Sequence, residues 1–223
     1  MVWYKKNARK LNELRKELVS QFPDLWVDVV NNEVFIRGGF PVIANDLEID
    51  RYAILIKLPK DYPLSPPTVF EINNCIPRIK DRHINPDGSA CLFLHDEAWK
   101  YYSPNMSMVD FLKGPVNDFF LMQQEIELRG RPLIDARRHG EKGIIDYYTE
   151  ELGTNDVTVI TKFLEYLCKK PKGHRECYCG SNKKIRDCHL YKLQEMSEKI
   201  PHSAAGKSLQ RLLDYIQQSS IKK

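Results

Sequence analysis

The chain of 223 residues is long enough for one sizeable domain and a smaller second one. Its 42% hydrophobic, 29% charged and 10% aromatic residues are typical of a globular protein and exclude a largely disordered chain. No apolar stretch reaches the roughly 18 to 20 residues of a membrane-spanning helix, and the first residues turn polar without the apolar segment of a secretory signal. We therefore expect a cytoplasmic protein with no membrane partner.

The formal net charge of +4 is distributed unevenly. Residues 169–192 hold eight Lys or Arg against Glu176 and Asp187, a net of +6, so the rest of the chain carries −2. Such a segment can bind a partner or nucleic acid, or it can be the solvated face of a small module. Because Tyr178 and Tyr191 do not alternate with the basic residues as base-stacking side chains do, we favour a solvated face or a protein partner over nucleic acid.

The first third of the chain predicts a helix followed by an antiparallel meander. Residues 3–22 read as an amphipathic helix because Leu and Phe recur at spacings of three and four, and Pro23 ends it. Short runs rich in Val, Ile and aromatic residues then predict strands, separated by Asn-Asn, Gly-Gly and Asn-Asp dipeptides. We expect these strands over residues 25–30, 32–39, 51–58 and 67–72.

The remainder predicts mainly helices. Four prolines within residues 59–67 exclude a helix or a central strand and predict a stiff connector. Apolar residues predict a buried helix over 106–123 despite Gly114-Pro115, followed by a polar loop over 129–143. Further helices are expected over residues 144–152, ended by Gly153 as a cap, 156–170 and 208–218. The predicted fold class is α+β.

Six cysteines must be explained in a reducing compartment, where disulfides are rare. Cys75 and Cys168 lie in settings that suit ordinary burial. Cys91 differs, because Gly88-Ser89-Ala90 precede it in the stretch HINPDGSACLFL and give the backbone freedom close to the thiol. The other three, Cys177, Cys179 and Cys188, gather near the end of the chain.

Three motifs in order resemble the ubiquitin-conjugating enzyme family. YPLSPP at 62–67 is similar to its Tyr-Pro-x-x-Pro-Pro, and GSACL at 88–92 is similar to its Gly-x-x-Cys-Leu active-site segment. Trp99 and Ser103-Pro104 follow as in its Trp-Ser-Pro region, with a short insertion. The resemblance covers about residues 1–125 and implies that Cys91 carries a protein C-terminus as a thioester, which a substrate amine then displaces.

Two departures affect the neighbours of Cys91. The family has a His-Pro-Asn triplet whose Asn lies eight residues before the cysteine. When this chain is aligned to the family without gaps, that position is His83. If the loop is two residues shorter here, the matching triplet is His83-Ile84-Asn85. Either His83 or Asn85 could stabilise an oxyanion, and His83 could act as a base. Phe93 stands where many members carry an acid. The alternatives are a buried Cys91, and His83 and Asn85 as hydrogen-bonded loop residues.

These departures, and HGEKGIIDYY at 139–148, resemble bacterial ubiquitin-conjugating-like proteins of the CBASS-associated antiphage type. That resemblance implies a partner: a cGAS/DncV-like nucleotidyltransferase (CD-NTase) that is joined through its C-terminus to a target and thereby raises its output. The chain has no Gly-rich nucleotide-binding segment, so activation of the C-terminus falls to a separate enzyme or to another route.

The segment CYCGSNKKIRDCH at 177–189 resembles the SEC-C zinc motif. Its three thiols and one imidazole match the ligands that zinc prefers in a tetrahedral site. We expect Cys177, Cys179, Cys188 and His189 to hold a structural zinc ion without an open catalytic position; the alternative is a set of free thiols.

We therefore expect a ubiquitin-conjugating-like core over residues 1–152, a helical linker over 153–173, a zinc module over 174–192 and a C-terminal helix over 193–223. The expected activity is that of a cysteine-dependent acyl transferase in antiphage defence. Two alternatives stay open. One is a scaffold that binds a ubiquitin-like protein without chemistry, and the other is a cysteine hydrolase that recruits His83 and Asn85.

Overall fold

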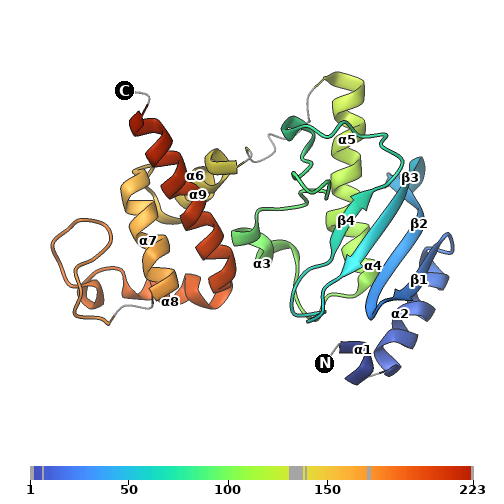
Figure 1. The fold of residues 1–223 in the computed structure, drawn as a ribbon, viewed down its shortest axis with the longest axis horizontal. Helices are drawn as coiled ribbons and strands as arrows, with labels where there is room; N and C mark the ends of the chain where they lie inside the picture. Colours follow the sequence, from blue (N-terminus) through green and yellow to red (C-terminus); the bar gives the residue numbers. More distant parts are fainter. Residues whose placement is uncertain (1–2, 7, 131–137, 139, 170–171, 222–223) are drawn as a thin grey trace. The chain divides into compact units, whose positions relative to one another are not determined.

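The computed structural model describes residues 3–6, 8–130, 138, 140–169 and 172–221 (Figure 1). The fold is α+β, as predicted, with a four-stranded antiparallel sheet and helices before and after it. Contacts divide the chain into two compact units, one of residues 1–93 and 100–136 and the other of residues 94–99 and 137–223. Within the described ranges, no helix has both the length and the apolar character needed to cross a membrane.

The predicted first helix is present as α1 (Trp3–Lys6) and α2 (Ala8–Gln21). Helix α2 buries Leu11, Leu14 and Leu18, the apolar stripe that its periodicity predicts. It ends at Gln21, two residues before Pro23.

The sheet is the predicted meander, with the strands side by side in the order β1, β2, β3, β4. Both hairpins turn at dipeptides that the sequence singles out: Asn31-Asn32 and Asn45-Asp46 all have positive φ, the backbone of a two-residue turn of type I′. The strands are β1 (Leu25–Val30), β2 (Glu33–Ala44), β3 (Leu47–Leu58) and β4 (Thr68–Glu71).

Strands β2 and β3 are longer than predicted, and Gly38-Gly39 lie within β2 instead of separating two strands. Gly38 has φ +139°, and a β-carbon there would lie 1.9 Å from the carbonyl oxygen of Asp24. Glycine is therefore needed at position 38 because the backbone of Asp24, just before β1, lies so close to it, and not because the chain turns there.

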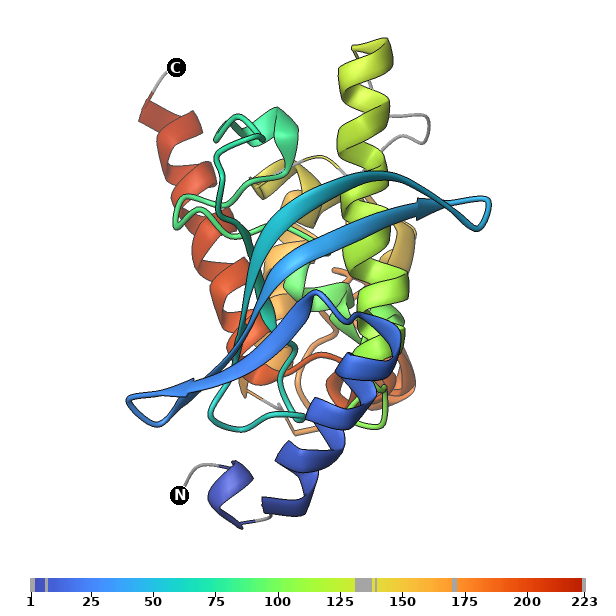
Figure 2. The same ribbon diagram turned by 90° about the vertical axis from the view of Figure 1, so that its right-hand side faces the viewer.

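The core of the first unit lies between the sheet, α2 and the helices that follow. Side chains on one face of β2 and β3 are buried, and the ring of Phe120 packs against those of Phe40 and Tyr52 at centroid distances of 5.6 and 4.5 Å. Figure 2 shows the twisted β2–β3 hairpin with the helix that carries Phe120 behind it. This packing fixes the long hairpin on the helical layer.

The buried helix expected over residues 106–123 is present but kinked. It comprises α4 (Met108–Phe111), a π-type segment (Leu112–Val116) and α5 (Asn117–Arg129). Gly114, which precedes Pro115, has a non-helical φ/ψ of −94° and −106°, as expected where proline disfavours helical geometry in the residue before it.

The Pro-rich connector over residues 59–67 contains no helix or strand, as predicted. Beyond β4 the chain forms two short 3-10 turns, η1 (Lys80–Arg82) and η2 (His95–Glu97), and helix α3 (Ala98–Tyr101). Between Phe93 and Lys100 the chain enters the second unit and returns.

The second unit is helical, with a core that includes Tyr147, Tyr148 and Phe163. Gly153 ends the first of its helices with φ +68°, as predicted. The single C-terminal helix expected over residues 193–223 is divided at Pro201 into two helices, of which the first begins at Leu190. The elements are α6 (Gly140–Leu152), α7 (Val157–Lys169), the 3-10 turn η4 (Ile185–Asp187), α8 (Leu190–Lys199) and α9 (His202–Ile221).

Contacts group these elements differently from the divisions expected from the sequence. Helix α6 falls within the expected core over 1–152, yet it packs in the second unit. Helix α7, expected as a linker, buries Ile160, Phe163 and Leu164 there. Of the polar loop expected over 129–143, residues 131–137 and 139 lie outside the described residues, and so does His139 of the segment 139–148.

Candidate active site and metal centre

The chain just before Cys91 is a turn closed by its own polar side chains. The carboxylate of Asp87 accepts hydrogen bonds from the amide and the hydroxyl of Ser89 at 3.0 and 2.6 Å, and these bonds lower the pKa of Asp87. The side-chain amide of Asn85 donates to the Ser89 hydroxyl at 3.0 Å, and its backbone N–H donates to the Ser89 carbonyl at 2.8 Å. The turn is therefore internally braced.

Backbone hydrogen bonds join this turn to the sheet and to Cys91. The N–H of Ala90 donates to the carbonyl of Val69 in β4 at 2.7 Å, and Ile84 pairs with Ala90 across the turn. The N–H of Cys91 donates to the carbonyl of His83 at 2.8 Å, and its Sγ lies 4.0 Å from the carbonyl oxygen of Phe93. Cys91 is partly exposed, which differs from the alternative of a fully buried thiol.

The structure brings His83 and Cys91 together through their backbones, and it places Asn85 in the same turn. His83 has φ +54°, a left-handed conformation that is uncommon for residues other than glycine. The amide of Asn85 is directed at Ser89, as in the hydrogen-bonded loop alternative.

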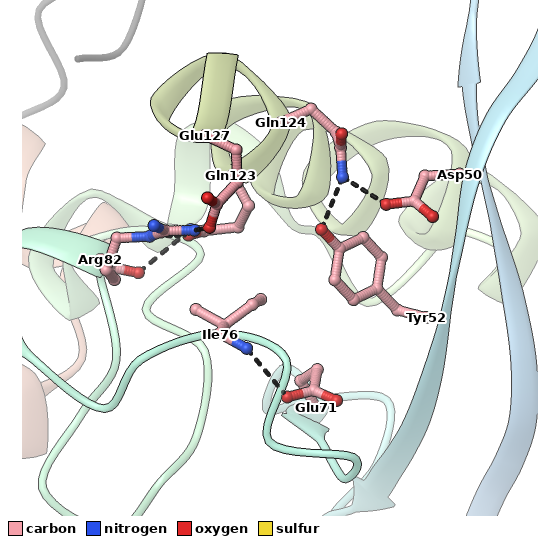
Figure 3. A network of polar contacts seen from close by, with 8 residues as sticks. All are labelled: Asp50, Tyr52, Glu71, Ile76, Arg82, Gln123, Gln124 and Glu127. Carbon is pink, nitrogen blue, oxygen red and sulfur yellow. Dashed lines mark hydrogen bonds and ion pairs between the residues drawn. The ribbon is translucent and has the colours of Figure 1, made fainter. Parts of the chain in front are cut away.

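A buried Arg82, which the sequence did not single out as a site residue, anchors the same loop to α5 (Figure 3). Its Nε donates to Gln123 at 2.8 Å and its guanidinium donates to Glu127 at 2.6 Å. The amide of Gln123, itself fully buried, donates back to the carbonyl of Arg82 at 3.0 Å. A charged side chain is buried at such cost only when it is paired, so this network holds the residue next to His83 firmly in place.

The predicted metal ligands gather into one cluster. The ligand atoms of Cys177, Cys179, Cys188 and His189 all lie within 4.8 Å of one another. The Sγ atoms of Cys179 and Cys188 are 3.7 Å apart, and the Nδ1 of His189 lies 3.3 Å from Cys177 Sγ and 3.1 Å from Cys188 Sγ. Two thiolates on a tetrahedral zinc ion are about 3.8 Å apart, so these residues fit a metal ion of that size.

Short backbone turns create this cluster. The N–H of Cys177 donates to the carbonyl of Lys183 at 2.8 Å, which closes a small hairpin whose turn includes Gly180 at φ +77°. Cys188 follows η4, and His189 directly precedes α8. Four donors from two neighbouring turns equal the number of ligands that a tetrahedral metal ion takes.

The charge states of the thiols are unequal in this cluster. Burial raises the pKa of Cys177. Burial acts in the same direction on Cys179, but hydrogen bonds from Ser181 and from the neighbouring thiols outweigh it and lower the pKa of Cys179 to about 6. The thiolate of Cys179 is therefore ready to ligate a cation near neutral pH.

The remaining cysteines were expected to be buried. Cys75 is instead exposed, because it lies in the loop after β4. Partial desolvation, with the carboxylates of Glu71 and Asp50, raises the pKa of Cys75, so its thiol is less ionised than an ordinary one. Cys168 is half-buried in α7.

Comparison with protein-family models, with curated proteins and with solved structures finds no match to this chain. Functional inference therefore depends on the residues and geometry described above.

Proposed function

We propose that this chain is a ubiquitin-conjugating-like acyl transferase in which Cys91 carries a protein C-terminus as a thioester. The observation that supports this most strongly is a partly exposed thiol at the end of a braced, glycine-containing turn that is hydrogen-bonded to the sheet edge. A nucleophile must be reachable and rigidly presented, and this setting favours both. The meander followed by a kinked helix also agrees with the implied ubiquitin-conjugating fold.

The proposed reaction has two acyl-transfer steps. The Cys91 thiolate attacks the carbonyl of an activated C-terminus, forms the thioester and releases the activating group. A substrate amine then attacks the thioester carbonyl, loses a proton to a base and expels the Cys91 thiolate. A donor near the carbonyl oxygen would stabilise each tetrahedral intermediate.

His83 and Asn85 are the candidates to assist. Asn85 has an amide that already donates to Ser89, so its first role in the proposal is to hold the turn. His83 is joined to Cys91 by a backbone hydrogen bond, and its imidazole is the candidate for the base.

We further propose that the ion held by Cys177, Cys179, Cys188 and His189 is a structural zinc. The donor set of three thiols and one imidazole and the sulfur–sulfur spacing of 3.7 Å support it. Free thiols of this kind persist in a reducing compartment, which agrees with a cytoplasmic protein.

The proposed partner is the cGAS/DncV-like nucleotidyltransferase implied by the resemblance, whose C-terminus would be the acyl group in antiphage defence.

A peptide thioester tests the transfer directly. The C-terminal peptide of the partner nucleotidyltransferase, prepared as a thioester of a small thiol, is mixed with the chain and followed by intact mass. We expect the chain to gain one peptide that dithiothreitol removes, Cys91→Ala to abolish the gain, and Cys75→Ala, which removes an exposed thiol elsewhere, to preserve it. Acylation of Cys75 as fast as of Cys91 would be unspecific thiol exchange and would refute the proposal. Release of free peptide acid without transfer to an amine would favour the hydrolase.

A further inference from the structure

The chain that leaves Cys91 is held in the second unit. Residues 94–99 belong to the same compact unit as residues 137–223, whereas Phe93 and Lys100 on either side belong to the first. Leu94 is only three residues from Cys91. Contacts that hold residues 94–99 therefore act on the chain within three residues of the thiol.

Asp96 is the anchor of this segment. Its side chain is fully buried, and its two carboxylate oxygens accept hydrogen bonds from the hydroxyl of Tyr148 at 2.6 Å and from that of Ser208 at 2.5 Å. Tyr148 lies in α6 and Ser208 in α9, so one carboxylate joins residues 94–99 to two helices. A buried carboxylate is unfavourable unless both oxygens are satisfied, which makes this attachment specific to one position of the segment.

Further contacts hold the rest of the segment. The indole N–H of Trp99 donates to the hydroxyl of Tyr147 at 3.3 Å, and the ammonium of Lys199 lies 4.5 Å from the Trp99 ring centroid. Where the chain leaves and re-enters the first unit, the rings of Phe93 and Tyr101 stack at 5.9 Å with an interplanar angle of 4°. Between this stack and the hydrogen bond from Cys91 to His83, the chain around the thiol has little freedom.

From these contacts we infer that Asp96 is a positioning residue for Cys91. It touches no reacting atom; by holding residues 94–99 on α6 and α9 it restrains the chain that directly follows the thiol. The expected effect on peptide transfer rests on the proposed function. The expected effect on the reactivity of the Cys91 thiol does not.

The test removes the two donors separately. Tyr148→Phe and Ser208→Ala each delete one hydroxyl and leave the rest of the chain intact. The alkylation rate of Cys91 by iodoacetamide is measured by peptide mass spectrometry, with exposed Cys75 as the reference in the same molecule. We expect the ratio of the Cys91 to the Cys75 alkylation rate to rise about fivefold, because the loss of one hydrogen bond of ordinary strength makes local opening more frequent by about that factor. Peptide transfer should become slower. An unchanged ratio in both variants would overturn the inference.

A matched control separates positioning from general loosening. Thr161→Ala removes another buried hydroxyl of the same unit, one that donates to the carbonyl of Val157 at 2.7 Å within α7. We expect this variant to leave the ratio unchanged; an equal rise would mean general loosening and would refute the role of Asp96. Asp96→Asn, which keeps an acceptor, should stay within about twofold of the native ratio, whereas Asp96→Ala should not. If the native chain accepts no peptide, the proposed function fails, and the alkylation ratios still decide the role of Asp96.

Discussion

His83 combines a candidate chemical role with an unusual backbone. Its φ of +54° is tolerated by asparagine and histidine better than by most residues, and its carbonyl accepts the N–H of Cys91. A substitution that changes both the imidazole and the backbone preference would confuse the two roles.

Asparagine separates them. We predict that the unfolding free energy of His83→Asn lies within about 0.5 kcal/mol of the native value, because asparagine accepts the left-handed backbone. If the imidazole is the base, peptide transfer to an amine falls by about 10²-fold or more. Both are measured on one preparation, by guanidinium unfolding and by single-turnover transfer. Transfer at the native rate would remove His83 from the chemistry.

Asp96 predicts a pH dependence of stability. Burial raises the pKa of Asp96, while the hydrogen bonds from Ser208 and Tyr148 oppose this. The folded chain therefore holds this proton more tightly than the unfolded chain, and the stability from the protonated form is lost as the pH rises through the folded pKa. Asp96→Asn has no such proton, so its unfolding free energy minus that of the native chain should increase from pH 4.5 to pH 7. If this difference in unfolding free energy is flat or falls over the range, the pKa of Asp96 is not raised.

At this scale the sequence led to residues that carry recognisable chemistry. Cys91, His83 and Asn85 stood out through a motif, and all three lie in or next to one turn. Arg82 and Asp96 did not stand out, because a charged residue is normally exposed and only tertiary partners from α5, α6 and α9 make its burial favourable.

At the scale of elements, α5 supports the turn that presents Cys91. The buried Gln123 accepts from Arg82 Nε and donates to the Arg82 carbonyl, whereas its neighbour Gln124 serves a separate network, donating to Asp50 and to the hydroxyl of Tyr52 (Figure 3). Two adjacent glutamines thus hold two different parts of the first unit.

This pair provides a matched experiment. Gln123→Leu should cost about 2–4 kcal/mol, because the buried Nε of Arg82 and the Arg82 carbonyl both lose their partner, while the guanidinium keeps Glu127. It should also speed alkylation of Cys91. Gln124→Leu should destabilise the chain without that effect, since its partners lie on β3. Unfolding and alkylation are measured for both; equal alkylation rates in the two variants would show that the α5 network does not position the thiol.

Local signals were sufficient for most elements. The strands were predicted from their Val, Ile and aromatic residues, and the Asn-Asn and Asn-Asp turns and the Gly153 cap from turn and cap chemistry. The extension of β2 through Gly38-Gly39 was not, because it depends on the crossing at Asp24. The division of the expected C-terminal helix into α8 and α9 was not predicted either, although Pro201, which disfavours a continuous helix, lies between them.

At the scale of the whole molecule, the candidate metal ligands Cys177, Cys179 and Cys188 belong to the core of the second unit. Tyr178, between two ligands, is buried and packs its ring against Phe163 at 4.9 Å, and Phe163 packs against Tyr148 at 5.8 Å. Because these side chains share one core, we expect the stability of the second unit to depend on a bound metal ion.

Metal removal tests this. A strong zinc chelator, or Cys179→Ser, should lower the stability of the second unit by several kcal/mol. Hydrogen exchange should show protection lost over residues 172–200 and retained over β1–β4. Elemental analysis should find one zinc per native chain and per Cys75→Ala control. Unchanged protection over 172–200 after the metal has been removed would exclude a structural ion.

The most direct test of the thioester proposal is the trapped form of Cys91. In Cys91→Ser, attack by the hydroxyl would give an oxygen ester that persists through purification in the presence of thiols. The variant, produced together with the partner nucleotidyltransferase and its activating proteins, is analysed by intact mass and by peptide sequencing. We predict one adduct, a protein C-terminus linked to residue 91. An unmodified residue 91 in this variant, with no thiol-labile adduct on the native chain, would contradict the proposal that Cys91 carries an acyl group.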